Sequence, residues 1–177
     1  FGEANILLHI LTHDLGLIIA SARSARLSSS RLRGALQEYC YVSVSCIKSK
    51  NGWKVTNVSD KGNFFFDYPP YSHKVLSQIA FILIRMIAGE SPHQQIFQTV
   101  RSGFEFLKTV EEKSVSNFET LIVLRILWYL GYVVMNFETE IFFQTPTEWG
   151  DQLLWKVAEN KIGLVGFINK ALKESHL

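Results

Sequence analysis

The stretch YCYVSVSCIKSKNGWKVTNV, residues 39–58, decides the fold of the first part of this chain. From Tyr39 to Cys46, tyrosine or serine alternates with cysteine or valine, and a period of two residues predicts a β-strand. Asn51 and Gly52 are typical of a tight hairpin turn, and Trp53–Val58 continues as the partner strand. We therefore predict a β-hairpin over this stretch.

Two aliphatic runs before this stretch predict a second hairpin. Ile6–Thr12 and Leu17–Ala22 are separated by the sequence His-Asp-Leu-Gly, which supplies a turn. Four short antiparallel strands within about 60 residues are typical of a small β-barrel. The chain begins at Phe1 without a methionine, so we expect the first strand of the barrel to be truncated and to include Phe1–Ala4.

The pattern changes after the adjacent prolines Pro69 and Pro70, which end the β-structure. Apolar residues then recur at intervals of three and four through Val75–Ile87, which predicts an amphipathic helix. Ser91 followed by Pro92 predicts the start of the next helix. We expect an antiparallel β-barrel over residues 1–68 and an all-helical domain over residues 69–177.

Three further helices are expected in the helical part. Ser116 and Glu119 have the spacing of a capping box, and the helix Phe118–Leu130 is apolar nearly all round, which places it at the centre of the bundle. Thr145–Glu148 is expected to open another helix, and Leu164–Leu172 marks the last one. Strands followed by helices give an α+β fold class.

The composition indicates a chain with a real hydrophobic core, because 47% of its residues are hydrophobic and 19% are charged. Arg85 and Arg125 interrupt the longest apolar runs, which fall short of the roughly 18 residues that a membrane span needs. The two arginines could be functional charges at an interface, but we favour a structural role in which each reaches the surface or pairs with a carboxylate. No export signal is visible, so the cytoplasm is the expected location.

The sequence contains no motif typical of a metal site, a cofactor site or an enzyme active site. Cys40 and Cys46 lie six residues apart on one face of a predicted strand, outside bonding contact, and no cysteine and histidine cluster has ligand spacing. Glycine-rich phosphate loops, nucleophile elbows and paired carboxylates are absent from the sequence. We therefore expect a binding protein without catalytic activity, metal or cofactor.

Positive charge is concentrated at the N-terminal end. Through Lys61 the chain has eight basic and four acidic residues, whereas from Gly62 onward it has ten basic and twelve acidic. Within the basic part, the stretch RSARLSSSRLR carries four arginines with no acidic residue between them: Arg23, Arg26, Arg31 and Arg33. Such a stretch is typical of a loop that contacts phosphate groups, and the alternative is a solvated basic loop.

The predicted hairpin at residues 39–58 adds further candidates for contact with nucleic acid. Lys48, Lys50 and Lys54 are proposed from their charge alone. Trp53, Tyr39 and Tyr41 lie among basic residues on the predicted strands and are candidates for stacking on unpaired bases, although aromatic strand residues more often belong to a core.

Three segments together resemble one protein family. FGEANILLHILTHDLGLIIASARSAR, residues 1–26, and SSSRLRGALQEY, residues 28–39, are similar to the opening of RecO, a bacterial recombination mediator. LRILWYLGY, residues 124–132, resembles the RecO helix that ends in Leu-Gly-Tyr. The resemblance runs from Phe1 to Tyr132 and is strongest up to Tyr39.

The resemblance implies an OB-fold-like barrel that binds single-stranded and double-stranded DNA. It also implies strand annealing and loading of RecA, with RecR and the single-stranded DNA-binding protein as partners. The basic positions that match the family are Arg23, Arg31 and Arg33, and DNA contact is carried onto these three. Arg26 and the three lysines rest on charge alone.

The chain departs from the family pattern in two places. Val133–Thr145 contains no cysteine, so the zinc module that many RecO proteins carry there is absent or shortened. Thr120 and Leu121 stand where a pair of arginines usually begins the Leu-Gly-Tyr helix, which removes charges expected to bind the acidic tail of the single-stranded DNA-binding protein. A helical scaffold for protein interactions, with weak or no DNA binding, is therefore the alternative function.

Overall fold

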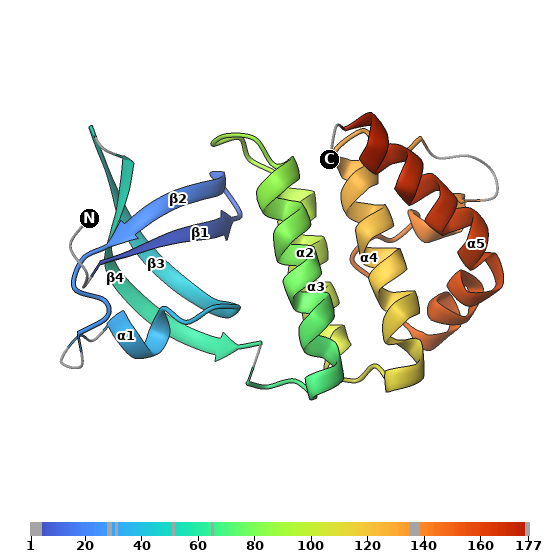
Figure 1. The fold of residues 1–177 in the computed structure, drawn as a ribbon, viewed down its shortest axis with the longest axis horizontal. Coiled ribbons are helices and arrows are strands. Elements are labelled where there is room, and N and C mark those ends of the chain that lie inside the picture. Colours follow the sequence, from blue (N-terminus) through green and yellow to red (C-terminus); the bar gives the residue numbers. More distant parts are fainter. Residues whose placement is uncertain are drawn as a thin grey trace.

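A computed structural model of the chain describes residues 5–27, 30, 32–50, 52–64, 66–134 and 139–175, without the side chains of Asp60 and Lys61. Figure 1 shows a twisted sheet at one end of the molecule and a group of helices at the other. The prediction that strands come first and helices follow is confirmed, and the fold is that of an OB-like sheet joined to helices.

Four strands form the sheet, in the spatial order β1-β2-β4-β3. Both predicted hairpins are confirmed, because β1 pairs with β2, and β3 with β4, in antiparallel register. The expected strand at Phe1–Ala4 lies outside the described residues. The strands are β1 (Ile6–Thr12), β2 (Gly16–Ala22), β3 (Cys40–Ser49) and β4 (Gly52–Asn63).

The sheet is not wholly antiparallel, which corrects the expected pairing. Ala20 and Ser21 of β2 lie beside Trp53 and Lys54 of β4, and this pair of strands runs parallel. Parallel neighbours need a long crossover connection, and here the loop after β2, the short helix α1 (Leu32–Ala35) and β3 provide it. The serine hydroxyl also donates to the Trp53 carbonyl at 3.3 Å.

The sheet has a small core of its own. Its buried side chains come from both hairpins and from the crossover: Ala20, Ala22, Ala25, Leu36 and Val55. The register of β3 against β4 shifts twice, after Tyr41 and after Ser45, and such bulges increase the bend and twist of a strand. This curvature is typical of barrel-forming sheets.

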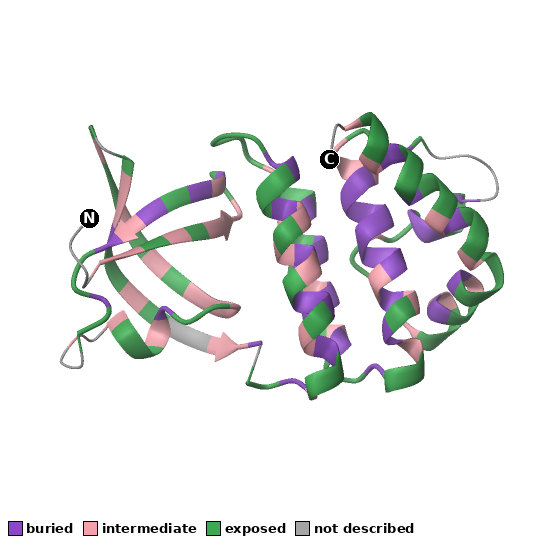
Figure 2. Ribbon diagram, in the orientation of Figure 1, coloured by how far each residue is buried: buried purple, intermediate pink, exposed green. Residues whose placement is uncertain are grey.

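The helical part has α4 at its centre, as predicted. Ten of its fifteen residues are buried, and Figure 2 shows it as the most continuously buried helix. Gly131 follows it at a φ of 80°, and the Tyr132 amide donates back to the Leu127 carbonyl at 2.9 Å, so the Leu-Gly-Tyr segment ends the helix. The helices are α2 (His73–Met86), α3 (Gln94–Leu107), α4 (Val115–Tyr129) and α5 (Asp151–Glu174).

Two expected helix starts are wrong. The first residue of α3 is Gln94, with His93 at the N-cap position, so Ser91 and Pro92 precede the helix. The Ser91 backbone instead lies against the turn between β1 and β2. Helix α4 begins one residue before Ser116, and no side chain caps it, because a short 3-10 turn leads directly into the helix.

The prediction of two separate C-terminal helices is also wrong. A single helix, α5, spans 24 residues, and the segment that was expected to open a helix at Thr145 is irregular. Its carbonyl groups point at Arg125 of α4 instead. The buried guanidinium donates to the carbonyls of Phe142, Thr145, Pro146 and Glu148 at 2.9–3.3 Å.

Arg125 therefore neither reaches the surface nor pairs with a carboxylate. Its side chain is fully buried, and the guanidinium lies 4.4 Å from the ring centre of Trp149. Burial lowers the pKa of Arg125 to about 10, which leaves the group charged at neutral pH. By contrast, Arg85 of α2 is exposed and lies over the ring of Phe81, as expected for a side chain at the surface.

The sheet and the helices share an interface. The His13 ring meets the edge of Phe97 at 5.7 Å, and the Tyr39 hydroxyl is 3.1 Å from the Ser77 hydroxyl. Phe64, at the end of β4, is buried in the same core as the helices. Among the described residues, no helix is long and apolar enough to cross a membrane.

Gly16 makes a close backbone contact in this interface, and its replacement tests that contact. The residue has a φ of 68°, and a Cβ atom there would lie 1.9 Å from the Ser91 carbonyl oxygen. We expect Gly16→Ala to lower the free energy of unfolding by more than the roughly 1–3 kcal/mol that a left-handed backbone costs a non-glycine residue. Urea unfolding measures the loss.

Gly131→Ala is the matched control, because Gly131 has a similar φ of 80° and a Cβ atom added there would meet no atom of the described residues within 4 Å. This variant carries the cost of a left-handed backbone at a non-glycine residue but has no steric clash. Equal losses in the two variants would contradict a close contact between the β1–β2 turn and Ser91.

Candidate nucleic-acid interface

The arginine-rich stretch, residues 23–33, follows β2 directly: residues 23–26 form a turn, and Arg33 already lies in α1. The Leu27 amide donates to the Ser24 carbonyl at 3.1 Å, the Ser30 amide to Leu27 at 3.0 Å, and the Arg33 amide to Ser30 at 3.2 Å. We call these residues the arginine loop. Figure 1 shows the loop and α1 at the end of the sheet farthest from the helices.

The arginine loop is fastened to the sheet at its base. The Ser24 amide donates to the Asn5 side-chain oxygen at 3.0 Å, just before β1 begins. Ala25, inside the first turn, and Leu36, just after α1, are buried in the sheet core. These apolar contacts hold the stretch on the sheet, and its described arginines face solvent.

The described arginines of this loop are all exposed: Arg23, Arg26 and Arg33. Within the part of the chain that the structure describes, Arg23 and Arg33 form no ion pair. Arg31 lies outside the described residues. Two guanidinium groups without a carboxylate partner, on one loop, are available for phosphate groups.

The lysines of the second hairpin differ in their surroundings. Lys54 lies beside Ser21, two residues before Arg23, so the parallel pairing of β2 and β4 brings it toward the arginine loop. Lys50 is exposed in the turn after β3. The Lys48 ammonium, in contrast, is bound to the Glu90 carboxylate at 2.6 Å.

The three aromatic candidates are also divided. The Tyr41 ring is stacked on Phe64 at 6.2 Å and lies under the Arg101 guanidinium, and Tyr39 contacts Ser77, so both tyrosines belong to the interface with the helices. Trp53 is half-buried, and its indole N–H donates to Glu90 at 2.9 Å. Of the three, only Trp53 lies at the lysine-bearing end of the hairpin.

Comparison with known proteins bears on the same residues. The model of the family "Recombination protein O N terminal" matches residues 1–60, which contain every basic residue proposed for DNA contact. A DNA repair protein RecO of Dehalococcoides mccartyi strain 195 is 36% identical over 110 residues, or 60% of this chain. Residues 1–60 are thus similar to the N-terminal part of RecO.

The matches to RecO proteins cover only part of each relative. The 110 aligned residues span 42% of the RecO of strain 195. The RecO of Dehalococcoides mccartyi strain BAV1 is 47% identical over 49 residues, which are 28% of this chain and 19% of that protein. The aligned part thus covers less than half the length of these relatives.

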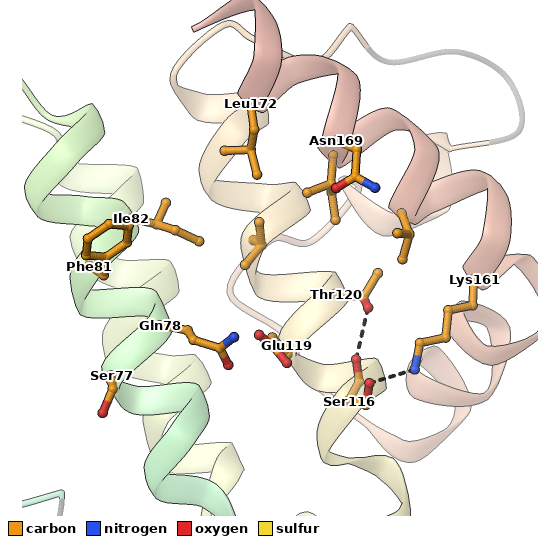
Figure 3. A pocket seen from close by; sticks show the side chains of 13 residues that line it. Ser77, Gln78, Phe81, Ile82, Ser116, Glu119, Thr120, Lys161, Asn169 and Leu172 are labelled. Carbon is orange, nitrogen blue, oxygen red and sulfur yellow. Dashed lines mark hydrogen bonds between the residues drawn. The ribbon is translucent and has the colours of Figure 1, made fainter. Parts of the chain in front are cut away.

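A groove between α2, α4 and α5 is a feature of this chain that sequence reasoning missed. It has a volume of about 710 Å³, and Figure 3 shows side chains from all three helices around it. Thr120, one of the two positions without the usual arginine, is among them. Apolar walls come from residues such as Phe81, Ile82 and Leu172.

Polar groups lie at one end of this groove. The Lys161 ammonium binds the Ser116 hydroxyl at 2.8 Å and the Asn117 side-chain oxygen at 2.9 Å. The side-chain oxygen of Gln78 is buried and has no hydrogen-bond partner among the described residues. Burial raises the pKa of Glu119. The groove is thus a second surface with binding features, of mixed charge.

Metal ligands are not gathered anywhere in the described part of the chain, where no three His, Cys, Asp or Glu side chains meet. Cys46 is a half-buried thiol that forms no disulfide with any cysteine in the described part of the chain. Burial raises the pKa of the Cys46 thiol, which favours its protonated, unreactive form.

Proposed function

We propose that this chain is a DNA-binding recombination mediator of repair that acts without catalysis. The observation that carries the proposal is the arginine loop, which holds exposed guanidinium groups on an OB-like sheet within the residues that match RecO. OB-like sheets bind single strands by combining basic tracks along the backbone with aromatic stacking. The loop supplies the basic track here.

In this proposal, the phosphate chain contacts the arginine loop and continues along the hairpin lysines. The residues proposed for contact are Arg23, Arg26, Arg31, Arg33, Lys48, Lys50 and Lys54. Arginine binds phosphate oxygens through two parallel N–H donors, which fixes the path of the backbone without reading base sequence. Binding of this kind accepts single-stranded and double-stranded DNA of any sequence.

Salt dependence tests the proposal directly. With about four phosphate contacts to a single strand, the logarithm of the binding constant should fall against the logarithm of salt concentration with a slope near −3, because each contact releases counterions. Fluorescence anisotropy of a labelled oligonucleotide, titrated at several salt concentrations, gives the slope. Affinity that is independent of salt would sink the phosphate-contact model.

We further propose that the chain anneals complementary strands and helps RecR to load RecA, and that it works in the cytoplasm on damaged chromosomal DNA. Residues 1–68 are proposed as the DNA-binding unit, and residues 69–177 as a helical unit without a zinc module. Faster annealing of complementary oligonucleotides coated with the single-stranded DNA-binding protein would support the mediator role.

The groove between α2, α4 and α5 favours a second candidate function, a scaffold that binds proteins and has little affinity for DNA. Grooves of this size with apolar walls are typical ligand sites. Stable binding to purified RecR, together with no DNA mobility shift at low salt, would favour the scaffold over the DNA-binding mediator.

A further inference from the structure

Glu90 joins the helical part to the lysine-bearing hairpin. The residue lies in the connection between α2 and α3. One carboxylate oxygen is 2.6 Å from the Lys48 ammonium, and the other accepts a hydrogen bond from the Trp53 indole N–H at 2.9 Å. The Lys48 ammonium also lies 5.4 Å from the ring centre of Trp53. The three side chains form one cluster.

This cluster has the chemistry of a phosphate contact. A carboxylate and a phosphodiester each present two oxygens that share a negative charge, and both accept bonds from an ammonium and an N–H donor. Lys48 and Trp53 thus hold a carboxylate in the way that they would hold the DNA backbone. Hydrogen bonds from these two groups lower the pKa of Glu90, which keeps the carboxylate ionised.

We propose that Glu90 acts as an internal competitor of DNA, which occupies Lys48 and Trp53 until a phosphate group displaces it. The inference rests on the proposed function of DNA binding. It assigns to the cluster a role in setting affinity: the arginine loop binds first, and the hairpin adds its contacts only after Glu90 leaves.

The geometry allows this exchange. The Lys48 and Glu90 side chains are 61% and 40% exposed, and ion pairs at such surfaces are weak, so DNA can displace the carboxylate. Glu90 cannot diffuse away, because the next residue, Ser91, is packed against Gly16. A tethered competitor has a high effective concentration at its site even when its contacts are weak.

The test compares Glu90→Gln with Glu111→Gln in anisotropy titrations of a labelled oligonucleotide. Glu111 forms an exposed pair with Lys113 at 2.7 Å, so both variants remove one charge from a surface pair. We expect Glu90→Gln to bind about 3–10-fold more tightly at low salt, a range that matches the weakness of exposed pairs. Its salt slope should steepen by about 0.7, because one more phosphate is neutralised. Glu111→Gln should match the natural protein.

Two further variants test whether the effect of Glu90 on affinity depends on Lys48, and whether it depends on more than the net charge of the protein. In a Lys48→Gln background, the gain from Glu90→Gln should disappear, since the freed contact no longer exists. Glu90→Asp keeps the charge, but its shorter side chain cannot reach both partners, so we expect a smaller gain in affinity than with glutamine.

The outcomes separate this inference from the function on which it rests. If the natural protein binds DNA and Glu90→Gln has the affinity and slope of Glu111→Gln, Glu90 only fastens the hairpin to the helices and the inference is wrong. If neither the natural protein nor Glu90→Gln binds DNA at low salt, the proposed function fails, and the inference fails with it.

Discussion

Replacing Arg125 with methionine is expected to lower the free energy of unfolding by about 3–5 kcal/mol, because several buried carbonyls each lose a partner at a cost of about 1–3 kcal/mol. The arginine donates to the carbonyls of four residues in the segment before α5. Methionine fills a similar volume but donates nothing, so these buried acceptors lose their partner. Urea denaturation followed by circular dichroism measures the change.

Arg85→Met is the matched control, because Arg85 also interrupts an apolar helix but is exposed and lies over Phe81. Its replacement should cost less than about 1 kcal/mol, as is usual at surface positions. A loss of that small size in Arg125→Met would show that the carbonyl groups find other donors or water.

Reversing the charge of Arg23 and Arg33 together is expected to weaken DNA binding by about 100-fold or more. Hydrogen bonds to charged groups are each worth about 1.5–3 kcal/mol, and about 1.4 kcal/mol corresponds to a factor of ten in affinity. The salt slope should also become shallower by about 1.4, since two phosphate contacts to a single strand are lost. Anisotropy titrations measure both quantities.

Lys170→Glu with Lys173→Glu gives the same change in net charge at the exposed end of α5. This control should reduce affinity only slightly. Equal weakening in the two double variants would mean that DNA responds to the net charge of the protein, and the arginine loop would lose its assigned role.

Local patterns in the sequence predicted most of the elements. The alternation through Val42 and Val44 indicated β3, and the apolar circumference of residues 118–130 placed α4 at the centre of the bundle. These predictions were correct because the period of a strand and the burial of a helix depend on the pattern of residues that are close in sequence. The position of the arginine loop followed in the same way from the end of β2.

Tertiary contacts explain where local patterns failed. Gly163 and Gly166 lie inside α5, but each costs a helix only about 1 kcal/mol, and the buried side chains of α5, such as Leu164 and Ile168, outweigh that cost. The parallel contact between Ser21 and Lys54 depends on a crossover that no short window of sequence contains.

In the candidate site, too, local features could be predicted from the sequence and long-range contacts could not. Exposure of Arg23 and Arg33 agrees with a loop rich in charge and poor in carboxylates. The pairing of Lys48 with Glu90 spans 42 positions and depends on how the hairpin lies against the connection between α2 and α3. No charge pattern near Lys48 signals it, and the groove beside Glu119 likewise exists only once three helices are packed.

Because the carbonyls that solvate Arg125 all come from Phe142–Glu148, the chain cannot be shortened gradually from its C-terminal end. Loss of α5 alone exposes the apolar side chains of the helical core. Truncation before Phe142 also removes the carbonyls that accept the hydrogen bonds of Arg125, and it leaves the buried guanidinium of α4 unpaired. We therefore expect a protease that cuts ahead of this segment to unfold the helical part as a whole, because α4 then holds a buried charge without acceptors.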